Sequence, residues 1–114
     1  MVKISGQAQR IRIYIGEASK YHGVNLYHAI VLKAKELGLA GATVFKGLEG
    51  FGANSRIKTS KILDLSSDLP IIVEVIDSAE YLKEFLAFLD DAVQEGLITV
   101  EDLEVRRYSP KKGR

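Results

Sequence analysis

The segment FKGLEGFGANSRIKT, residues 45–59, concentrates residue types that could bind a phosphate. Glycine reaches left-handed backbone angles that turn successive N–H groups towards one anion, and Gly47, Gly50 and Gly52 are close enough in sequence for this. Phe51, between two of these glycines, could stack on a base or anchor the segment. The pattern predicts a phosphate-binding loop, and the alternative is a flexible turn with a solvated run of charge. The cations that could neutralise the anion are Lys46, Arg56, Lys58 and Lys61.

The order of these residues differs from the common nucleotide-binding motifs. A P-loop has Gly-Lys followed by Ser or Thr at a helix start, whereas Lys46 precedes the glycines. The dinucleotide fingerprint G-x-G-x-x-G joins a strand to a helix, whereas this chain has G-x-x-G-x-G between two expected strands. Gly50-Phe51-Gly52 is superficially similar to an RNA-recognition signature, but the expected third strand, IIVEVI, offers no aromatic platform for a base. With a net charge of only +1 as well, no nucleic-acid partner is expected.

Glu17, His22 and His28 are the candidate metal-ligating residues. Two histidines and a carboxylate can bind zinc or iron when the geometry is right. His22 falls in an expected loop and His28 in the following helix, without H-E-x-x-H spacing. Solvated or core-edge histidines explain the pattern better, so no metal site is predicted, and the chain has no cysteine to supply a thiolate ligand.

Residues for catalysis do not form a recognisable set. No serine lies in a G-x-S-x-G motif. Glu49 or Asp64 could act as a general base, but nothing in the sequence locates a group to be attacked, so both are interpreted as surface carboxylates. An acylphosphatase, which shares the expected topology, needs an arginine-bearing phosphate loop after the first strand, and residues 16–19 contain no arginine. We therefore expect a protein that is not an enzyme and carries no prosthetic group.

The elements that must position the glycine segment follow from hydrophobic periodicity. Isoleucines alternate with polar residues over Gln9–Ile15, which predicts a strand with one core face. A helix should begin after an Asn25 cap and end at Gly38, and a second should begin at a capping box of Asp77 and Glu80 and end at Gly96. The remaining strands are expected at Ala42–Lys46, Pro70–Ile76 and Leu103–Tyr108.

The resulting order is β-α-β-β-α-β. It predicts one α+β domain over residues 1–114, a ferredoxin-like fold whose four-stranded antiparallel sheet has two helices on one face. The connection from Gly47 to Leu69 is far longer than the roughly 2–5 residues of most hairpin loops, which favours a functional role. The tail from Ser109 to Arg114 is expected to fray. The sequence shows no signal peptide and no spanning segment, so a cytoplasmic location is expected.

Two helices can cover only one face of such a sheet, and the other face carries large apolar groups. Ile72 and Ile76 flank Glu74 on the third strand, and Tyr14 lies opposite the isoleucines of the first. An uncovered apolar face tends to find a partner, so self-association is predicted. The alternative is a wet face with scattered apolar residues. The charged side chains expected to pair across the interface are Arg12, Glu74, Glu104 and Arg106.

The segments IRIYIGE, LYHAIVLKAKELGLAGATVFKGLEGFG and LSSDLPIIVEVID together resemble the small PII-like family known as domain of unknown function one-ninety. The match runs from about Arg10 to Tyr108, and GATVFKGLEGFG with the SSDLP turn is its most specific part. The chain has Lys46 where many relatives have Arg and Lys58 where they have His. At the second position a permanent cation thus replaces a titratable group.

The resemblance implies a homotrimer that binds an adenine nucleotide (ATP, ADP or AMP) in clefts between subunits, with the long loop reporting to a partner protein. A fluoride-exporting membrane channel is the candidate partner that it implies. The alternative is a trimeric divalent-metal or ion-tolerance protein without nucleotide binding. Basic residues beyond the last strand of PII proteins contact phosphates, which makes Arg106 and Arg107 counterparts by placement. The nucleotide-binding set is then Lys46, Gly47, Gly50, Phe51, Gly52, Arg56, Lys58 and Arg106.

Overall fold

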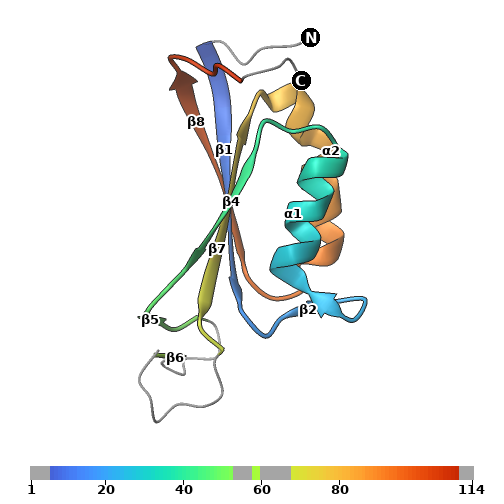
Figure 1. The fold of residues 1–114 in the computed structure, drawn as a ribbon, viewed down its shortest axis with the longest axis vertical. Coiled ribbons are helices and arrows are strands. Elements are labelled where there is room, and N and C mark those ends of the chain that lie inside the picture. The colour runs from blue at the N-terminus through green and yellow to red at the C-terminus, as the bar shows by residue number, and fades with distance from the viewer. Residues whose placement is uncertain (1–5, 53–57, 60–67, 111–114) are drawn as a thin grey trace.

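The computed structural model describes residues 6–52, 58–59 and 68–110, in which two helices cover one face of a twisted sheet (Figure 1). No described element covers the other face. Among the described residues neither helix is long and apolar enough to cross a membrane. In chain order the elements are β1 (Gly6–Gly16), β2 (Lys20–Tyr21), β3 (Val24–Asn25), α1 (Leu26–Glu36), β4 (Ala42–Lys46), β5 (Glu49–Gly50), β6 (Lys58–Thr59), β7 (Pro70–Asp77), α2 (Ala79–Ala92) and β8 (Leu97–Val105).

The main sheet has the strand order β4-β7-β1-β8, and every neighbouring pair is antiparallel. The central strand β1 pairs with β7 from Gln9 to Gly16 and with β8 from Gly6 to Tyr14. The predicted ferredoxin-like arrangement is confirmed. Two small hairpins, β2–β3 and β5–β6, were not predicted, and the second lies inside the long β4–β7 connection.

The core lies between the sheet and the helices. Ile11, Ile13 and Ile15 are buried on β1, as their alternation predicts, and the apolar stripe of α2 buries Leu82, Phe85 and Leu89. Burial of each large apolar side chain stabilises a fold by about 1.5–3 kcal/mol, so this single layer supplies most of the driving force for folding.

The first helix begins directly after Asn25, as predicted, but the expected side-chain cap is absent, and the predicted start of the second helix is wrong. Asn25 makes no side-chain cap; its Oδ1 accepts a hydrogen bond from Lys20 Nζ at 2.8 Å. The second helix begins at Ala79 after Ser78, so the capping box is wrong. Asp77 is completely buried instead, and its carboxylate accepts hydrogen bonds from the backbone N–H of Ala40 at 2.9 Å and of Ser78 at 2.7 Å. The aspartate therefore ties the turn before β4 to the end of β7.

The predicted last strand began too late and ended too late, because β8 spans Leu97–Val105. The helix before it ends at Ala92, and Gly96 lies in the turn between them with φ of +154°. A Cβ at Gly96 would stand 2.6 Å from the backbone oxygen of Tyr14, so only glycine fits where β8 meets β1. The strand must start this early because Leu97 already pairs with Tyr14.

The uncovered face carries an apolar row that crosses the sheet from edge to edge. Phe45 pairs with Ile72, Ile72 with Tyr14, and Tyr14 with Leu97, so one residue comes from each strand. Phe45 is 46% exposed and Leu97 56% exposed. We call these four residues the open-face row. Towards the other end of the sheet, Arg12 pairs with Glu74 and Arg10 with Glu101.

Candidate functional site

Both ends of the β4–β7 connection are fastened to the sheet and to the turn after β1. The backbone N–H of Gly47 donates to the oxygen of Pro70 at 2.7 Å, and that of Glu17 donates to the oxygen of Leu69 at 2.9 Å. The carboxylate of Asp68 accepts a hydrogen bond from the N–H of Ala18 at 2.9 Å. The base of the connection is thus a defined structure.

Close approach of the backbone explains two of the loop glycines. A Cβ at Gly47 would stand 2.7 Å from Pro70 Cγ, and one at Gly50 would stand 3.2 Å from it. Gly47, Gly50 and Gly52 all lack positive φ, so the expectation that they take left-handed angles to form an anion nest is wrong. A Cβ at Gly52 would meet none of the described residues within 4 Å. The glycines therefore shape a hollow by leaving room at the strand end.

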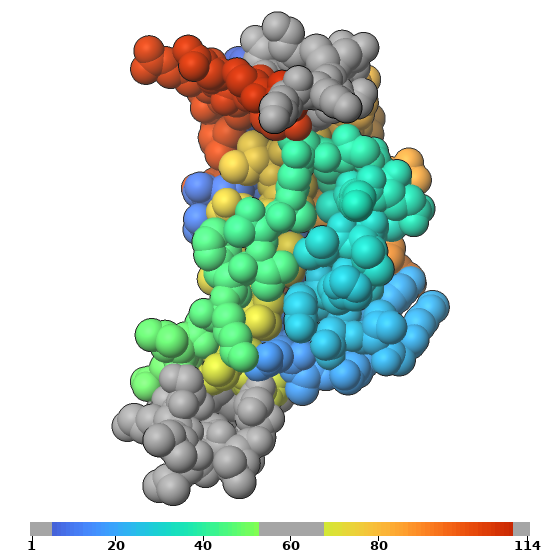
Figure 2. Space-filling model, viewed as in Figure 1, coloured from blue at the N-terminus to red at the C-terminus, as the bar shows by residue number. Residues whose placement is uncertain are grey.

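A pocket of about 610 Å³ opens at this end of the sheet. The connection contributes four of the predicted site residues to its lining: Gly47, Gly50, Phe51 and Gly52. The segment that carries them follows β4 and projects at the lower end of the molecule in Figure 2. Three residues of the open-face row also line the pocket: Tyr14, Ile72 and Leu97. The pocket therefore joins the predicted loop to the predicted association face.

The lining of the pocket is mostly apolar, and its charged residues are acidic. Glu49, Asp68 and Glu95 line it, and no Lys or Arg belongs to its lining among the described residues. Tyr14 and the 71% exposed Phe51 offer aromatic faces that could stack on a planar ring. These walls suit the base and sugar of a nucleotide better than its phosphates, because carboxylates repel phosphate and accept hydrogen bonds from ribose hydroxyls.

Among the described residues, the predicted cations do not line this pocket within one chain. Lys46 points to the turn after β1, where its Nζ lies 3.0 Å from Glu17 Oε2. Arg106 follows β8, whose end pairs with the start of β1 and so lies at the opposite end of the sheet (Figure 1). Arg56 lies outside the described residues, and Lys58 is described only through its backbone pairing with Gly50. The roles of these cations stay predictions.

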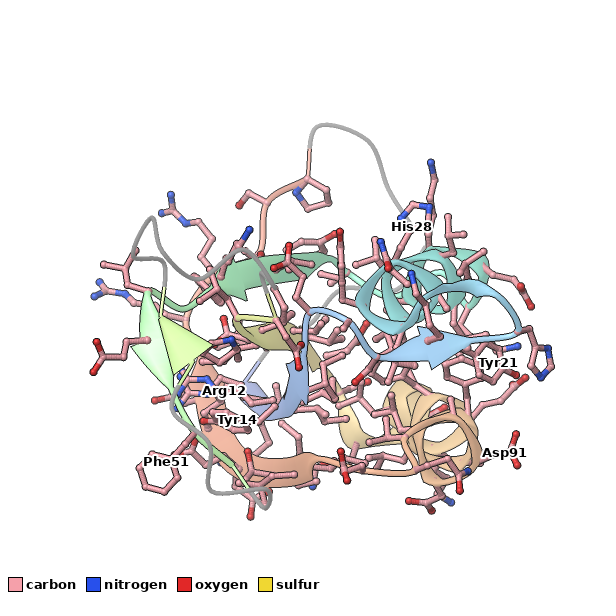
Figure 3. The ribbon with its side chains drawn as sticks, turned by 90° about the horizontal axis from the view of Figure 1, so that it is seen from below. Arg12, Tyr14, Tyr21, His28, Phe51 and Asp91 are labelled. Atoms are coloured by element: carbon pink, nitrogen blue, oxygen red, sulfur yellow. The ribbon has the colours of Figure 1, made fainter. Side chains whose placement is uncertain are left out.

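Arg12 and Glu74 lie on the open face next to the open-face row. Arg12 Nε donates to Glu74 Oε2 at 2.9 Å, so these two residues pair with each other within the chain. Their pairing across an interface stays a prediction. Hydrogen bonds to the side chains of Glu74 and then Tyr14 raise the pKa of Arg12 above its ordinary value. Figure 3 shows Arg12, Tyr14 and Phe51 on the side of the molecule away from the helices.

The histidines do not assemble a metal site in the part of the chain that the structure describes. His22 stacks on Tyr21 with ring centroids 4.1 Å apart, and His28 is exposed on α1. Glu17 pairs with Lys46. Residues 6–52, 58–59 and 68–110 contain no group of three potential metal-ligating side chains. The metal alternative thus gains no ligand set from these ranges.

Sequence reasoning missed several residues of the pocket. Asp68 and Glu95 were not considered because each comes from a turn, and only the folded register brings them to the end of the sheet. Leu97 lay outside the predicted last strand, which was expected to begin only at Leu103. Tyr14 was recognised as facing away from the core, and that alternation was the available signal for its place in the site.

Two comparisons with known proteins bear on the whole chain. The family model DUF190, described as "Uncharacterized ACR, COG1993", matches residues 8–105. A UPF0166 protein from Aquifex aeolicus (strain VF5) is 41% identical over 95 residues, which cover 83% of this chain and 90% of that one.

Solved structures share the fold at lower identity. CPII, a nitrogen regulatory PII-like protein from Thiomonas intermedia K12, was solved bound to ADP, AMP and bicarbonate; it is 19% identical, with a TM-score of 0.61 over 94% of each chain. The divalent ion tolerance protein CutA1 from Ehrlichia chaffeensis is 7% identical, with a TM-score of 0.57 over 96% of this chain and 90% of that one. The fold is thus shared by proteins with different tasks, and the family match is the more specific finding. The chain belongs to the DUF190 family, as its sequence resemblance predicted.

Proposed function

We propose that this protein is a PII-like regulator that binds an adenine nucleotide in the pocket at the base of the β4–β7 connection. The observation that carries the proposal is the convergence in one pocket of Gly47, Gly50, Phe51 and Gly52, the residues singled out in the sequence for phosphate-ligand binding. A volume of about 610 Å³ lies within the range of roughly 300–1,000 Å³ typical of small-molecule sites.

The walls suggest how a nucleotide would lie. The base would stack against Phe51 or Tyr14, and the carboxylates of Glu49 or Glu95 would accept ribose hydroxyl hydrogen bonds. The phosphates would extend towards cations, none of which belongs to the pocket lining among the described residues. The candidates are Lys46, Arg56, Lys58 and, from a second copy, Arg106.

Self-association follows from the same geometry. The open-face row borders the pocket, so a copy packed on this face would cover the pocket's outer wall. We propose a homotrimer with the nucleotide between subunits, in which the connection changes its affinity for a partner when ligand binds. A membrane channel for fluoride is the proposed partner, on family resemblance. The relationship to CPII, solved with ADP and AMP, supports the choice of ligand class.

Isothermal titration calorimetry with ATP, ADP, AMP and cyclic AMP tests the proposal. Saturable binding of at least one of them is expected, because the pocket offers aromatic and ribose-binding groups together. GTP serves as the control for recognition of the base, because it carries the same triphosphate as ATP on a different ring. A difference in affinity between ATP and GTP therefore reports contacts to the base and not attraction of the phosphates. Absence of saturation by every adenine nucleotide at millimolar ligand contradicts the proposal.

A further inference from the structure

The ion pair between Lys46 and Glu17 lies beside the pocket without lining it. Lys46 Nζ is 3.0 Å from Glu17 Oε2, while the neighbours Gly47 and Gly16 both belong to the pocket wall. A cation predicted to serve a phosphate ligand is therefore engaged by a carboxylate of its own chain. Its side chain is nevertheless 53% exposed, so a ligand can reach it.

The carboxylate of Glu17 is only half satisfied. Its Oε1 atom is buried and has no hydrogen-bond partner among the described residues. A buried acceptor in this state has lost its hydration without gaining a hydrogen bond, which offsets much of what the ion pair contributes. The pair is thus poorly stabilised, and an acceptor with more charge can displace Glu17 from Lys46.

The backbone of Glu17 is anchored independently of its side chain. Its N–H donates to Leu69, and the next N–H, that of Ala18, donates to Asp68. Both bonds involve main-chain donors, so changing the Glu17 side chain leaves them in place. Among the described residues, the polar partner of this carboxylate is therefore Lys46 alone.

We propose that Glu17 is an internal competitor of the ligand's phosphates for Lys46 and thereby a residue that determines ligand specificity. This inference rests on the proposed function in taking the ligand to bear phosphates. Coulomb attraction to Lys46 and repulsion by Glu17 both grow with the charge of the ligand. A triphosphate can displace Glu17 more readily than a monophosphate, so the pair sets how strongly the site distinguishes ligands by phosphate number.

The variant Glu17→Gln tests this, with Glu36→Gln as its matched control. Glu36 Oε2 pairs with Lys33 Nζ at 3.1 Å at the far end of α1, so the control removes the same charge from a lysine–glutamate pair away from the pocket. Calorimetry with ATP, AMP and inorganic tripolyphosphate is expected to show ATP and tripolyphosphate bound about three- to tenfold more tightly by Glu17→Gln. The gain for AMP should be smaller, and Glu36→Gln should match the wild type.

A second background separates competition for Lys46 from simple repulsion. The variant Lys46→Gln should bind ATP more weakly than the wild type does. Adding Glu17→Gln to this variant should restore little affinity, because the lysine for which Glu17 and the phosphates compete is absent. An undiminished gain in that background overturns the proposal, as does an unchanged or weaker affinity of Glu17→Gln for both polyphosphates. Glu17→Ala should repeat the gain if the glutamine variant folds poorly.

Two readouts distinguish failure of this inference from failure of the proposed function. If the wild type binds no nucleotide, a gain for tripolyphosphate in Glu17→Gln still supports competition at Lys46, and its absence overturns it. In the wild-type protein, saturating ATP should shift the side-chain NMR resonances of Lys46 and not those of Lys33. Saturation by ATP that leaves the Lys46 resonances unmoved overturns the inference and leaves nucleotide binding intact.

Discussion

The two faces of the sheet are made by the same strands and have opposite environments. On the helix side, Ile11, Ile13 and Val73 have no exposed surface, whereas on the other side Phe45 and Leu97 are about half exposed. Alternation along each strand assigns neighbouring residues to different faces. The comparison teaches that residues which stabilise the fold and residues which can bind a partner are next to each other along a strand. A substitution can therefore disturb one with little effect on the other.

The largest expected effect comes from two phenylalanines given the same change. Phe85 is completely buried in α2, so Phe85→Ala should cost about 3–5 kcal/mol of the free energy of unfolding through lost burial and a cavity. Phe51 is 71% exposed in the pocket wall, so Phe51→Ala should change stability by at most about 0.5 kcal/mol. Its affinity for ATP should nevertheless fall, since base stacking on an aromatic side chain contributes about 1–3 kcal/mol.

Chemical denaturation and calorimetry on both phenylalanine variants check this contrast. Equal losses of stability would show that Phe51 is packed in solution and that the two environments are not distinct. Retention of full ATP affinity by a folded Phe51→Ala protein would remove that ring from the site.

A smaller effect is expected from two glycines of the pocket wall. Gly47→Ala places a methyl group 2.7 Å from Pro70 Cγ, where the end of β4 meets the start of β7, and overpacking of this kind costs about 1–3 kcal/mol. Gly52→Ala meets none of the described residues within 4 Å and should be near neutral in stability. Thermal unfolding of the two variants measures the difference in their stabilities. Equal melting temperatures would mean that the base of the connection shifts to accommodate the added methyl group.

How far the sequence could predict these two faces follows from what each depends on. Isoleucines at 11, 13 and 15 reveal the covered face locally, because their period of two is independent of the rest of the chain. The open-face row depends on register, which aligns Tyr14 with both Ile72 and Leu97 across three strands. The start of β8 could not be predicted from neighbouring residues alone. The strand lies at the edge of the sheet, where buried and exposed residues do not alternate regularly.

The candidate site shows the same division. Its glycines and Phe51 could be recognised because they lie within six residues of the sequence, and all of them line one pocket in the structure. The direction of Lys46 could not be inferred, because it depends on the pairing of β4 with β7 and on Glu17, which lies 29 positions away. The residues of a short segment could therefore be predicted from the sequence. The charged groups that surround this segment could be identified only from the folded structure.

The last and most direct test of the open face comes from two residues on the edge strands of the sheet. The double variant Phe45→Ser with Leu97→Ser removes the two most exposed members of the open-face row and should change the stability of an isolated chain by less than about 1 kcal/mol. The proposed trimer should nevertheless dissociate, because that row supplies its apolar contact. Light scattering after size exclusion should give the mass of three chains for the wild type and of one for the variant. The matched control is Leu32→Ser with Val24→Ser, which removes two comparably exposed apolar residues that do not belong to the row and should leave the trimer intact. A wild-type monomer at micromolar concentration would break the comparison itself, because the open face would then be an ordinary wet surface whose apolar row recognises nothing of its own kind.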